Sequence, residues 1–258
     1  MWNNHHALDL LSKILFVLVA VTVLCGISLQ LIRPPFFPIK EINIQIVHGE
    51  GGINARLQNV SHAQIEKLVR NEIAGNFISV NLTAVREAFV KLPWVRDARV
   101  YREWPHGLNV MLEEHHALAY WGSHALVNTY GEVFRVTADV NLPVFIGPNE
   151  ASAYEVTQQY RRFNQILMPL QQHIAQVMLT QRYAWRIQLN TGTVLELGRN
   201  EIEERLIRYV SVYNHSIARL NQQHSLAYVD LRYPNGFAIR VPETMQQEPH
   251  KSVARRET

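Results

Sequence analysis

An uncharged apolar run near the N-terminus constrains this chain more than any other feature. It extends from Ile14 to Ile32 and is 19 residues long. At about 1.5 Å of rise per residue, a helix of this length spans roughly the 30 Å hydrocarbon core of a bilayer. The run therefore predicts one transmembrane helix over residues 14–32, in contact with the lipid bilayer. A short tail of residues 1–13 precedes it, and a linker of residues 33–38 follows it.

Three other interpretations of the run are less well supported by its residues. A buried core helix is one, but no other segment is comparably apolar and nothing amphipathic flanks the run. A cleaved signal peptide would use Lys13 as its basic region and residues 26–28 as a poor cleavage site, yet the apolar run continues to Ile32. Cys25 suggests a lipoprotein, but Leu24 before it is too bulky for a lipobox.

The charges that flank the run do not orient it. The tail offers Lys13 and the α-amine, whereas Arg33 and Lys40 lie just beyond the run. The positive-inside rule needs an excess of basic residues on one side, and these counts provide none. Charge alone therefore leaves open on which side of the membrane the large C-terminal part lies.

The rest of the chain has the composition of folded domains. Of 258 residues, 47% are hydrophobic and 18% are charged, which excludes global disorder. The net charge of +3 is too small to indicate a nucleic-acid partner. The single cysteine excludes an intramolecular disulfide, a thiolate zinc cluster and a redox pair of cysteines.

Hydrophobic periodicity predicts a small α+β domain over residues 39–114. Isoleucines alternate with polar residues from Ile42 to Ile46, which is typical of a half-buried strand. Ser61 and Asn81 are helix-capping residues that precede two apolar helical stripes. The predicted elements are a strand through Ile42–Ile46, helices at 61–75 and 81–93, and strands at Val95–Tyr101 and Leu108–Glu113, in the order β-α-α-β-β.

Short strand patterns and turn signals predict a second domain over residues 115–241, followed by a polar tail of residues 242–258. Two amphipathic helices are expected, one from about Ala151 to Gln172 and one that starts at Glu201. The expected strands are at 117–121, 125–128, 133–136, 177–179, 185–189, 194–197, 227–231 and 237–241. The predicted fold class is therefore α+β, with a mixed second domain built on an antiparallel-type sheet and two helices.

No motif in the sequence points to catalysis, a metal or a cofactor. There is no G-x-S-x-G elbow, Walker A loop or H-E-x-x-H motif. None of the twelve histidines has a second histidine at the i+4 position that helical zinc sites use. His115 and His116 would point to opposite faces of a strand. We expect no catalytic, metal or cofactor site, although a catalytic site assembled from distant residues stays open.

Two groups of residues at fixed spacing carry a family resemblance. The first group is Leu92-Pro93-Trp94-Val95, Ala98-x-Val100, Arg102-x-Trp104-Pro105, Leu108-x-Val110 and Glu113. The second group is Asn128-x-x-Gly131-x-Val133-Phe134, Leu142-Pro143, Arg182-x-x-Trp185, Leu197-Gly198-Arg199 and the run from Asp230 to Ala238. The chain resembles the FtsQ/DivIB family of bacterial cell-division proteins, with its POTRA domain first and its β domain second. Trp94, Val95 and Trp104 are expected to pack in the POTRA core.

The resemblance implies a non-catalytic bitopic protein of the inner membrane, with a cytoplasmic N-terminus and a large periplasmic part at the division septum. It implies a divisome scaffold that binds FtsB-like and FtsL-like bitopic proteins and helps to regulate septal peptidoglycan synthesis. FtsK-like and other divisome proteins would bind the POTRA domain. Two alternatives are a POTRA component of polypeptide transport, which would need repeated POTRA units or a barrel, and a periplasmic cell-wall enzyme.

The end of the second domain is the expected partner-binding site. A last strand from Phe237 to Val241, followed by a polar tail, would lie at a sheet edge, where it can accept a partner strand. The predicted partner-binding residues are Arg232, Tyr233, Gly236, Phe237, Ala238 and Val241.

These residues have different expected roles. Tyr233 and Phe237 would be aromatic anchors, and Arg232 would select the partner by charge. The small residues at 236 and 238 would leave the backbone accessible. The pattern alone favours Tyr233 as a core residue and an edge that the tail caps. The resemblance reverses this and favours binding of an FtsB-like protein here. The family often has a tryptophan where this chain has Val241.

Overall fold

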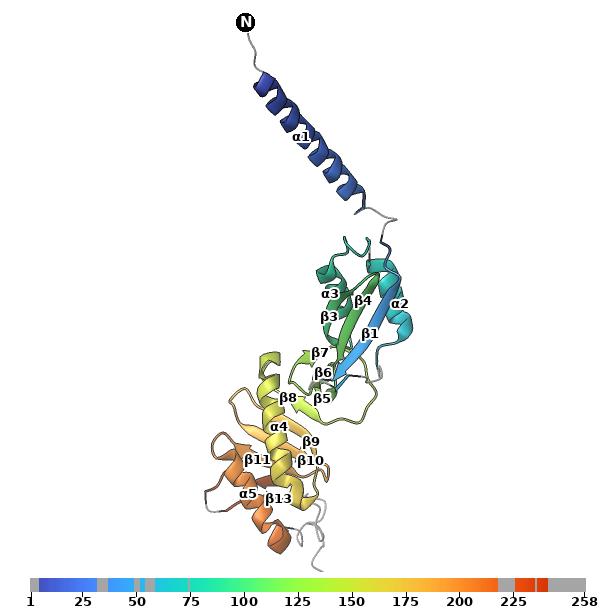
Figure 1. The fold of residues 1–258 in the computed structure, drawn as a ribbon. Helices are drawn as coiled ribbons and strands as arrows, with labels where there is room; N and C mark the ends of the chain where they lie inside the picture. Colours follow the sequence, from blue (N-terminus) through green and yellow to red (C-terminus); the bar gives the residue numbers. More distant parts are fainter. Residues whose placement is uncertain are drawn as a thin grey trace, which may run out of the picture. The chain divides into compact units, whose positions relative to one another are not determined.

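In the computed structural model the chain divides into two compact units, residues 1–115 and 116–258 (Figure 1). The structure describes residues 5–31, 37–48, 52–53, 59–73, 75–217, 226–234 and 236–240.

The apolar run forms a single long helix, α1 (His5–Leu31), of 27 residues. Its stretch Leu8–Ile27 is long and apolar enough to cross a membrane, and none of it is buried against the protein. The hydroxyl of Thr22 donates to backbone carbonyls one turn earlier, at 2.8 and 3.1 Å, so this hydroxyl is satisfied within the helix. The helix is consistent with the predicted transmembrane segment.

The rest of the first unit has the predicted order of strand, helix, helix, strand and strand. Its elements are β1 (Glu41–His48), β2 (Gly52–Ile53), α2 (His62–Glu72), α3 (Leu82–Val90), β3 (Val95–Glu103) and β4 (Gly107–Glu114). The sheet order is β2-β1-β4-β3, with β1 parallel to β4 and β3 antiparallel to it. The two-residue strand β2 is an addition that periodicity did not predict.

The two helices begin where their capping residues predict. Ser61 and Gln64 form a reciprocal capping box at α2, and the side chain of Asn81 accepts hydrogen bonds from the first turn of α3. Their apolar stripes pack on one face of the sheet, where Phe89, Leu108 and other core residues are fully buried.

Trp104 does not pack in this core, and the expectation that it does was wrong. Val95 is buried and Trp94 packs at the margin of the core, but Trp104 is 84% exposed. It follows the last residue of β3, in the turn that leads into β4, and lies outside the cluster of described core side chains.

The second unit is built on one mixed sheet. Its elements are β5 (Ala117–Trp121), β6 (Ala125–Asn128), β7 (Val133–Phe134), β8 (Val144–Ile146), η1 (Glu150–Ser152), α4 (Ala153–Leu167), η2 (Met168–Leu170), β9 (Ile174–Leu179), β10 (Trp185–Leu189), β11 (Val194–Gly198), α5 (Ile202–Val212), η3 (Tyr213–Ile217), β12 (Tyr228–Asp230) and β13 (Ala238–Arg240). The described strands follow the order β13-β12-β11-β10-β9-β8-β5-β6-β7. Five neighbouring pairs are antiparallel and three are parallel.

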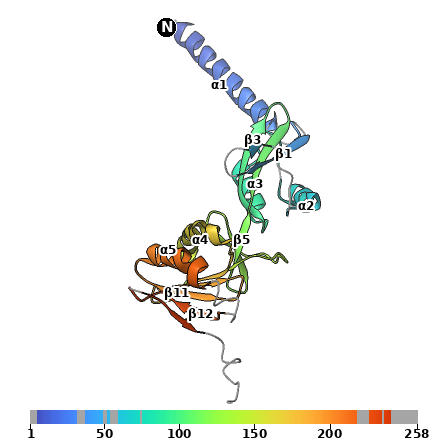
Figure 2. The same ribbon diagram turned by 90° about the horizontal axis from the view of Figure 1, so that it is seen from below.

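Both helices of this unit, α4 and α5, lie side by side on the same side of the sheet (Figure 2). Phe163 of α4 meets Trp185 of β10 edge to face, with ring centroids 5.8 Å apart. Tyr209 of α5 is fully buried, and this burial raises the pKa of its phenol well above the ordinary value. The α+β class predicted from the sequence is confirmed.

Candidate functional site at the last strand pair

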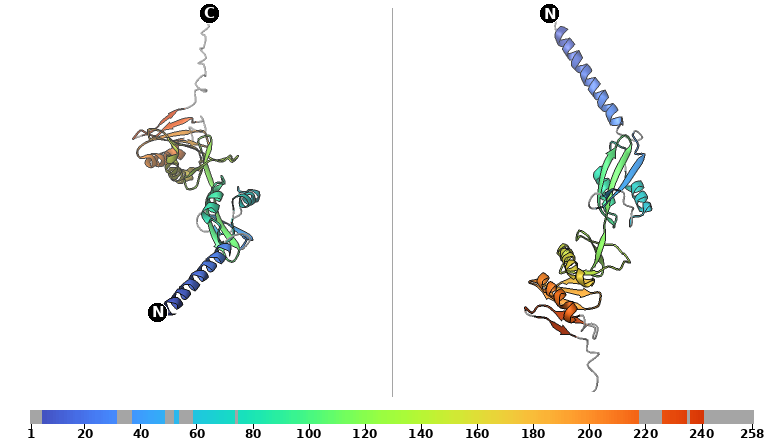
Figure 3. Two further views of the ribbon diagram at one scale, coloured as in Figure 1. Left: turned by 90° about the horizontal axis from the view of Figure 1, so that it is seen from above. Right: turned by 60° about the horizontal axis from the view of Figure 1, so that its bottom comes forward.

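The sheet of the second unit ends in a short antiparallel pair. β13 pairs only with β12 among the described strands, in the register Asp230↔Ala238, Val229↔Ile239 and Tyr228↔Arg240. Figure 3 shows β12 and β13 as the last, red strands of the sheet. Within the part of the chain that the structure describes, the outer side of β13 therefore faces no other strand.

The hydrogen bonds of β13 indicate which backbone groups face outward. The Arg240 carbonyl accepts from the Ala227 N–H at 3.3 Å, so Arg240 faces inward, towards the chain of β12. Backbone groups of successive residues in a strand point to alternate sides. The N–H and C=O of Ile239 therefore point away from β12, while its side chain packs at the margin of the core. This residue presents a donor and an acceptor to a strand that approaches the edge.

A buried carboxylate holds Arg232 beside this edge. Asp230 is 5% exposed and accepts from the Arg232 N–H at 3.0 Å and from Nε and Nη2 at 2.9 and 2.6 Å. These hydrogen bonds from Arg232 hold the pKa of the Asp230 carboxyl below its ordinary value, although burial opposes them. The side chain of Arg232 is still 57% exposed, so a positioned guanidinium faces solvent.

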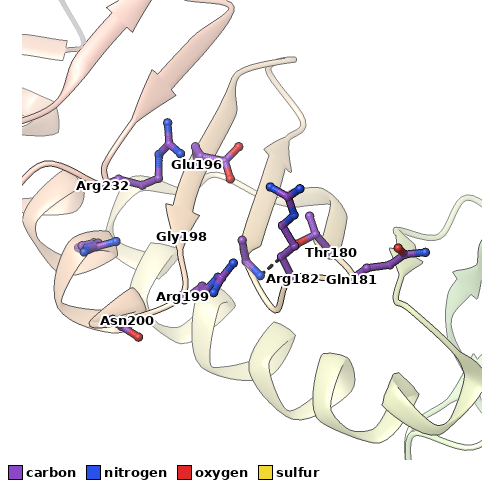
Figure 4. Close-up of a pocket in the computed structure, with 10 residues that line it drawn as sticks. Thr180, Gln181, Arg182, Glu196, Gly198, Arg199, Asn200 and Arg232 are labelled. Atoms are coloured by element: carbon purple, nitrogen blue, oxygen red, sulfur yellow. Dashed lines mark hydrogen bonds between the residues drawn. The ribbon is translucent and has the colours of Figure 1, made fainter.

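Arg232 also lines an open cavity of about 630 Å³ (Figure 4). The turn after β9 contributes Arg182, the residue after β11 is Arg199, and Arg205 comes from α5. These side chains meet because β9, β11 and β12 run in the same direction and end at the same side of the sheet. The cavity therefore combines four arginines with one carboxylate, Glu196.

Some charged side chains of the cavity have hydrogen-bond partners within the described residues, and others have none that forms an ion pair. Arg186 donates to Glu196 at 2.8 Å, and Arg205 donates to the Leu197 carbonyl at 2.7 Å. Arg182 and Arg199 are exposed and make no ion pair within the described residues. The cavity thus presents guanidinium groups that can bind a carboxylate.

Family comparisons match both units. The family model "Cell division protein FtsQ/DivIB, C-terminal" matches residues 119–232, and "POTRA domain, FtsQ-type" matches residues 53–115. The cell division protein FtsQ of Nitrosospira multiformis is 45% identical over 240 residues, which cover 93% of this chain and 99% of that protein. The chain belongs to the FtsQ/DivIB family.

Two further relatives, both also named cell division protein FtsQ, agree with this membership. The protein of Burkholderia pseudomallei is 36% identical over 93% of this chain and 94% of its own length. That of Coxiella burnetii is 33% identical over 90% of this chain and 91% of its own length. Family membership and the apolar helix α1 together indicate a single-pass membrane protein that acts in cell division.

The sequence-predicted site residues of this family member lie around the same edge, except for Val241, which lies outside the described residues. Tyr233 is 55% exposed, and its carbonyl accepts from Arg208 of α5 at 3.0 Å. Phe237 is half-buried and packs partly against the core, so only part of its ring faces solvent. The Ala238 side chain is exposed, and a Cβ at Gly236 would meet open space.

Sequence reasoning missed Arg182 and Arg199 as candidate site residues. Both lie in motifs that carried the family resemblance, Arg182-x-x-Trp185 and Leu197-Gly198-Arg199. The available sequence signal for a site here was Arg199, which directly follows the motif glycine Gly198. Gly198 has a φ of +77°, and a Cβ there would lie 3.1 Å from the Arg232 side chain and 2.8 Å from that of Arg205. The glycine therefore leaves room for the arginines that surround it.

Within the described residues, no group of three or more histidine, cysteine, aspartate or glutamate side chains is arranged to hold a metal ion. The outward N–H and C=O of Ile239 can pair with a strand, and the guanidinium groups in the cavity can bind a carboxylate.

Proposed function

We propose that this chain is a non-catalytic divisome scaffold that binds an FtsB-like bitopic protein, with an FtsL-like protein alongside, at the outer edge of β13. Its N-terminus lies in the cytoplasm and its two folded units lie in the periplasm at the division septum. Through this complex it helps to regulate septal peptidoglycan synthesis. FtsK-like and other divisome proteins bind the first unit. The observation that carries the proposal is the outward-facing edge of β13 beside the arginine-lined cavity.

The two parts of the site make different demands on the partner. An extended segment of the partner pairs with the outward N–H and C=O of Ile239. These main-chain hydrogen bonds give affinity that does not depend on the side chains of the partner. An acidic side chain of that segment enters the cavity and pairs with Arg182 or Arg232, which selects the partner by charge. Tyr233, exposed beside the edge, provides an aromatic contact.

Ile239 offers a matched pair of variants that tests strand addition. Ile239→Pro removes the outward N–H. Ile239→Ala keeps this N–H and, like the proline variant, loses the branched isoleucine side chain. Both are made in the full chain, reconstituted in nanodiscs, and titrated with the periplasmic segment of the FtsB-like protein of the same bacterium. We expect Ile239→Pro to weaken binding by about tenfold or more relative to Ile239→Ala, because one backbone hydrogen bond contributes about 0.5–1.5 kcal/mol and the ring also obstructs the pairing.

Two results would count against the proposal. Equal affinities of the proline and alanine variants would mean that no partner strand pairs at Ile239. Absence of binding by the unsubstituted chain at micromolar concentration would remove the scaffold role as stated.

A further inference from the structure

Hydrogen bonds and a ring contact join three segments of the first unit at the end where the chain enters it from α1. The Lys40 N–H donates to the His106 carbonyl at 2.9 Å, and the first residue of β1 lies opposite the first residue of β4. The Phe37 carbonyl accepts from the Phe77 N–H at 2.9 Å, and the Phe37 ring lies 6.4 Å from the His106 ring. These contacts place the entry segment, the turn before α3 and the β3–β4 turn at one end of the unit, here called the tethered end.

Exposed apolar side chains gather at the tethered end. Phe37 is 40% exposed, Ile78 46% and Trp104 84%. Among the described residues from 37 to 115, only two other large hydrophobic side chains are exposed, Val90 and Tyr101. A tryptophan in water forgoes the stabilisation that burial of its large ring would give. We call Phe37, Ile78 and Trp104 the apolar tip.

Hydrogen bonds hold the apolar tip in place. From the end of β3, Arg102 donates through Nε to the Phe77 carbonyl and through Nη2 to the Val80 carbonyl, both at 2.9 Å. A third bond reaches the Ile78 carbonyl at 3.3 Å. The turn that carries Ile78 is therefore fixed to the strand that leads to Trp104, so contact with another surface would cost little ordering of the backbone.

The tether keeps this end near the membrane. Five residues, 32–36, separate the last residue of α1 from Phe37. Even fully extended, such a connection spans only about 20 Å. The headgroup region on each side of the hydrocarbon core is roughly 5–8 Å deep. If α1 crosses the bilayer, the apolar tip is always within reach of this region.

We propose that the apolar tip docks into the headgroup region of the bilayer that α1 crosses, with the ring of Trp104 at the membrane interface. Tryptophan favours this zone because its large ring is apolar while its N–H can still bond to water or headgroups. Lys40, also at the tethered end, can interact with anionic headgroups. Glu41 and Glu103 lie at the same end and oppose this attraction. Burial of apolar surface, rather than net charge, therefore drives the contact. Docking would fix how the first unit is oriented on the membrane.

This proposal rests on α1 as a transmembrane helix and is independent of partner binding at β13. The test uses the full chain labelled with 5-fluorotryptophan and reconstituted in phosphatidylethanolamine–phosphatidylglycerol nanodiscs, without any partner. Fluorine resonances are assigned by Trp→Phe substitutions one at a time. Two paramagnetic probes are compared: lipids with a nitroxide on the acyl chain, and a gadolinium chelate confined to water.

We expect loss of the Trp104 signal with the acyl-chain nitroxide and its retention with the gadolinium chelate. Trp185, buried in the core of the second unit, is the internal control and should be broadened by neither probe. Broadening of Trp104 by the chelate alone would place the ring in water and overturn the proposal. Broadening by neither would mean that protein, such as a second copy of the chain, covers the tip, and would overturn it as well.

Discussion

The ion pair between Asp230 and Arg232 is expected to support both the fold and the arginine-lined cavity. The carboxylate is 5% exposed, and three donors of Arg232 point at it. Asp230→Asn keeps the size of the side chain but replaces a charged oxygen with an amide group that donates instead of accepting. The guanidinium would then lose its main partner and its fixed position beside the cavity.

The magnitude follows from the geometry. A hydrogen bond to a charged group contributes about 1.5–3 kcal/mol. Because the Arg232 side chain is 57% exposed, solvent screens part of this interaction. We expect Asp230→Asn to lower the free energy of unfolding by about 1–2 kcal/mol at pH 7.

The same pair predicts a pH dependence. Folding lowers the pKa of Asp230, chiefly through the hydrogen bond from Arg232, so near pH 3.8 and just below it the unfolded chain binds more protons. The stabilisation is therefore present above the ordinary value of 3.8 and is lost as the pH falls through the lowered pKa. The difference between the parent chain and Asp230→Asn should shrink over that acidic range.

Urea unfolding of the full chain in nanodiscs, followed by tryptophan fluorescence, measures this difference. A double-mutant cycle with Arg232→Ala isolates the energy that couples the two side chains. Asp97→Asn, which removes the 2.8 Å ion pair with Arg86 in the first unit, is the control for a general effect of losing a carboxylate. A coupling energy below about 0.3 kcal/mol would mean that the two side chains do not stabilise each other, since distant and independent sites show values of that size.

Three further predictions follow from single residues. Gly198→Ala should lower the midpoint of thermal unfolding more than Gly192→Ala, because both have positive φ but only Gly198 lacks space for a Cβ; equal shifts would contradict this. Asn81→Ala should cost about 1 kcal/mol of unfolding free energy by removing the cap of α3, whereas no measurable change would mean that the cap is dispensable. Arg182→Glu should weaken binding of the acidic partner segment at least about tenfold, an effect that salt reduces, while Arg162→Glu on α4 should not.

Local signals predicted much of the fold. The helices α2 and α3 start at Ser61 and Asn81 because their side chains satisfy the first free N–H groups, which is a property of a few adjacent residues. β8 was missed because three residues between Pro143 and Pro148 form a strand only through their neighbours in the sheet. Trp104 was misplaced because spacing predicts a strand end but does not reveal whether anything covers it.

Only part of the candidate site could be predicted from the sequence. A last strand after Tyr233 follows from alternation and a turn signal, and β13 is found there. The meeting of Arg182 with Arg232 depends on strand order: their strands, β9 and β12, are separated by two others and end on the same side. No local pattern contains that order, so the arginine-lined cavity emerges only from the assembled sheet.

Strand addition at β13 can be followed at the amide proton of Ile239, because it points away from β12 and faces no other described strand. Its hydrogen–deuterium exchange is measured in the full chain in nanodiscs, without and with a saturating amount of the periplasmic segment of the FtsB-like protein. We expect fast exchange in the free chain and strong slowing in the complex. Exchange at Ile239 that stays equally fast while the segment is bound would contradict strand addition at this edge.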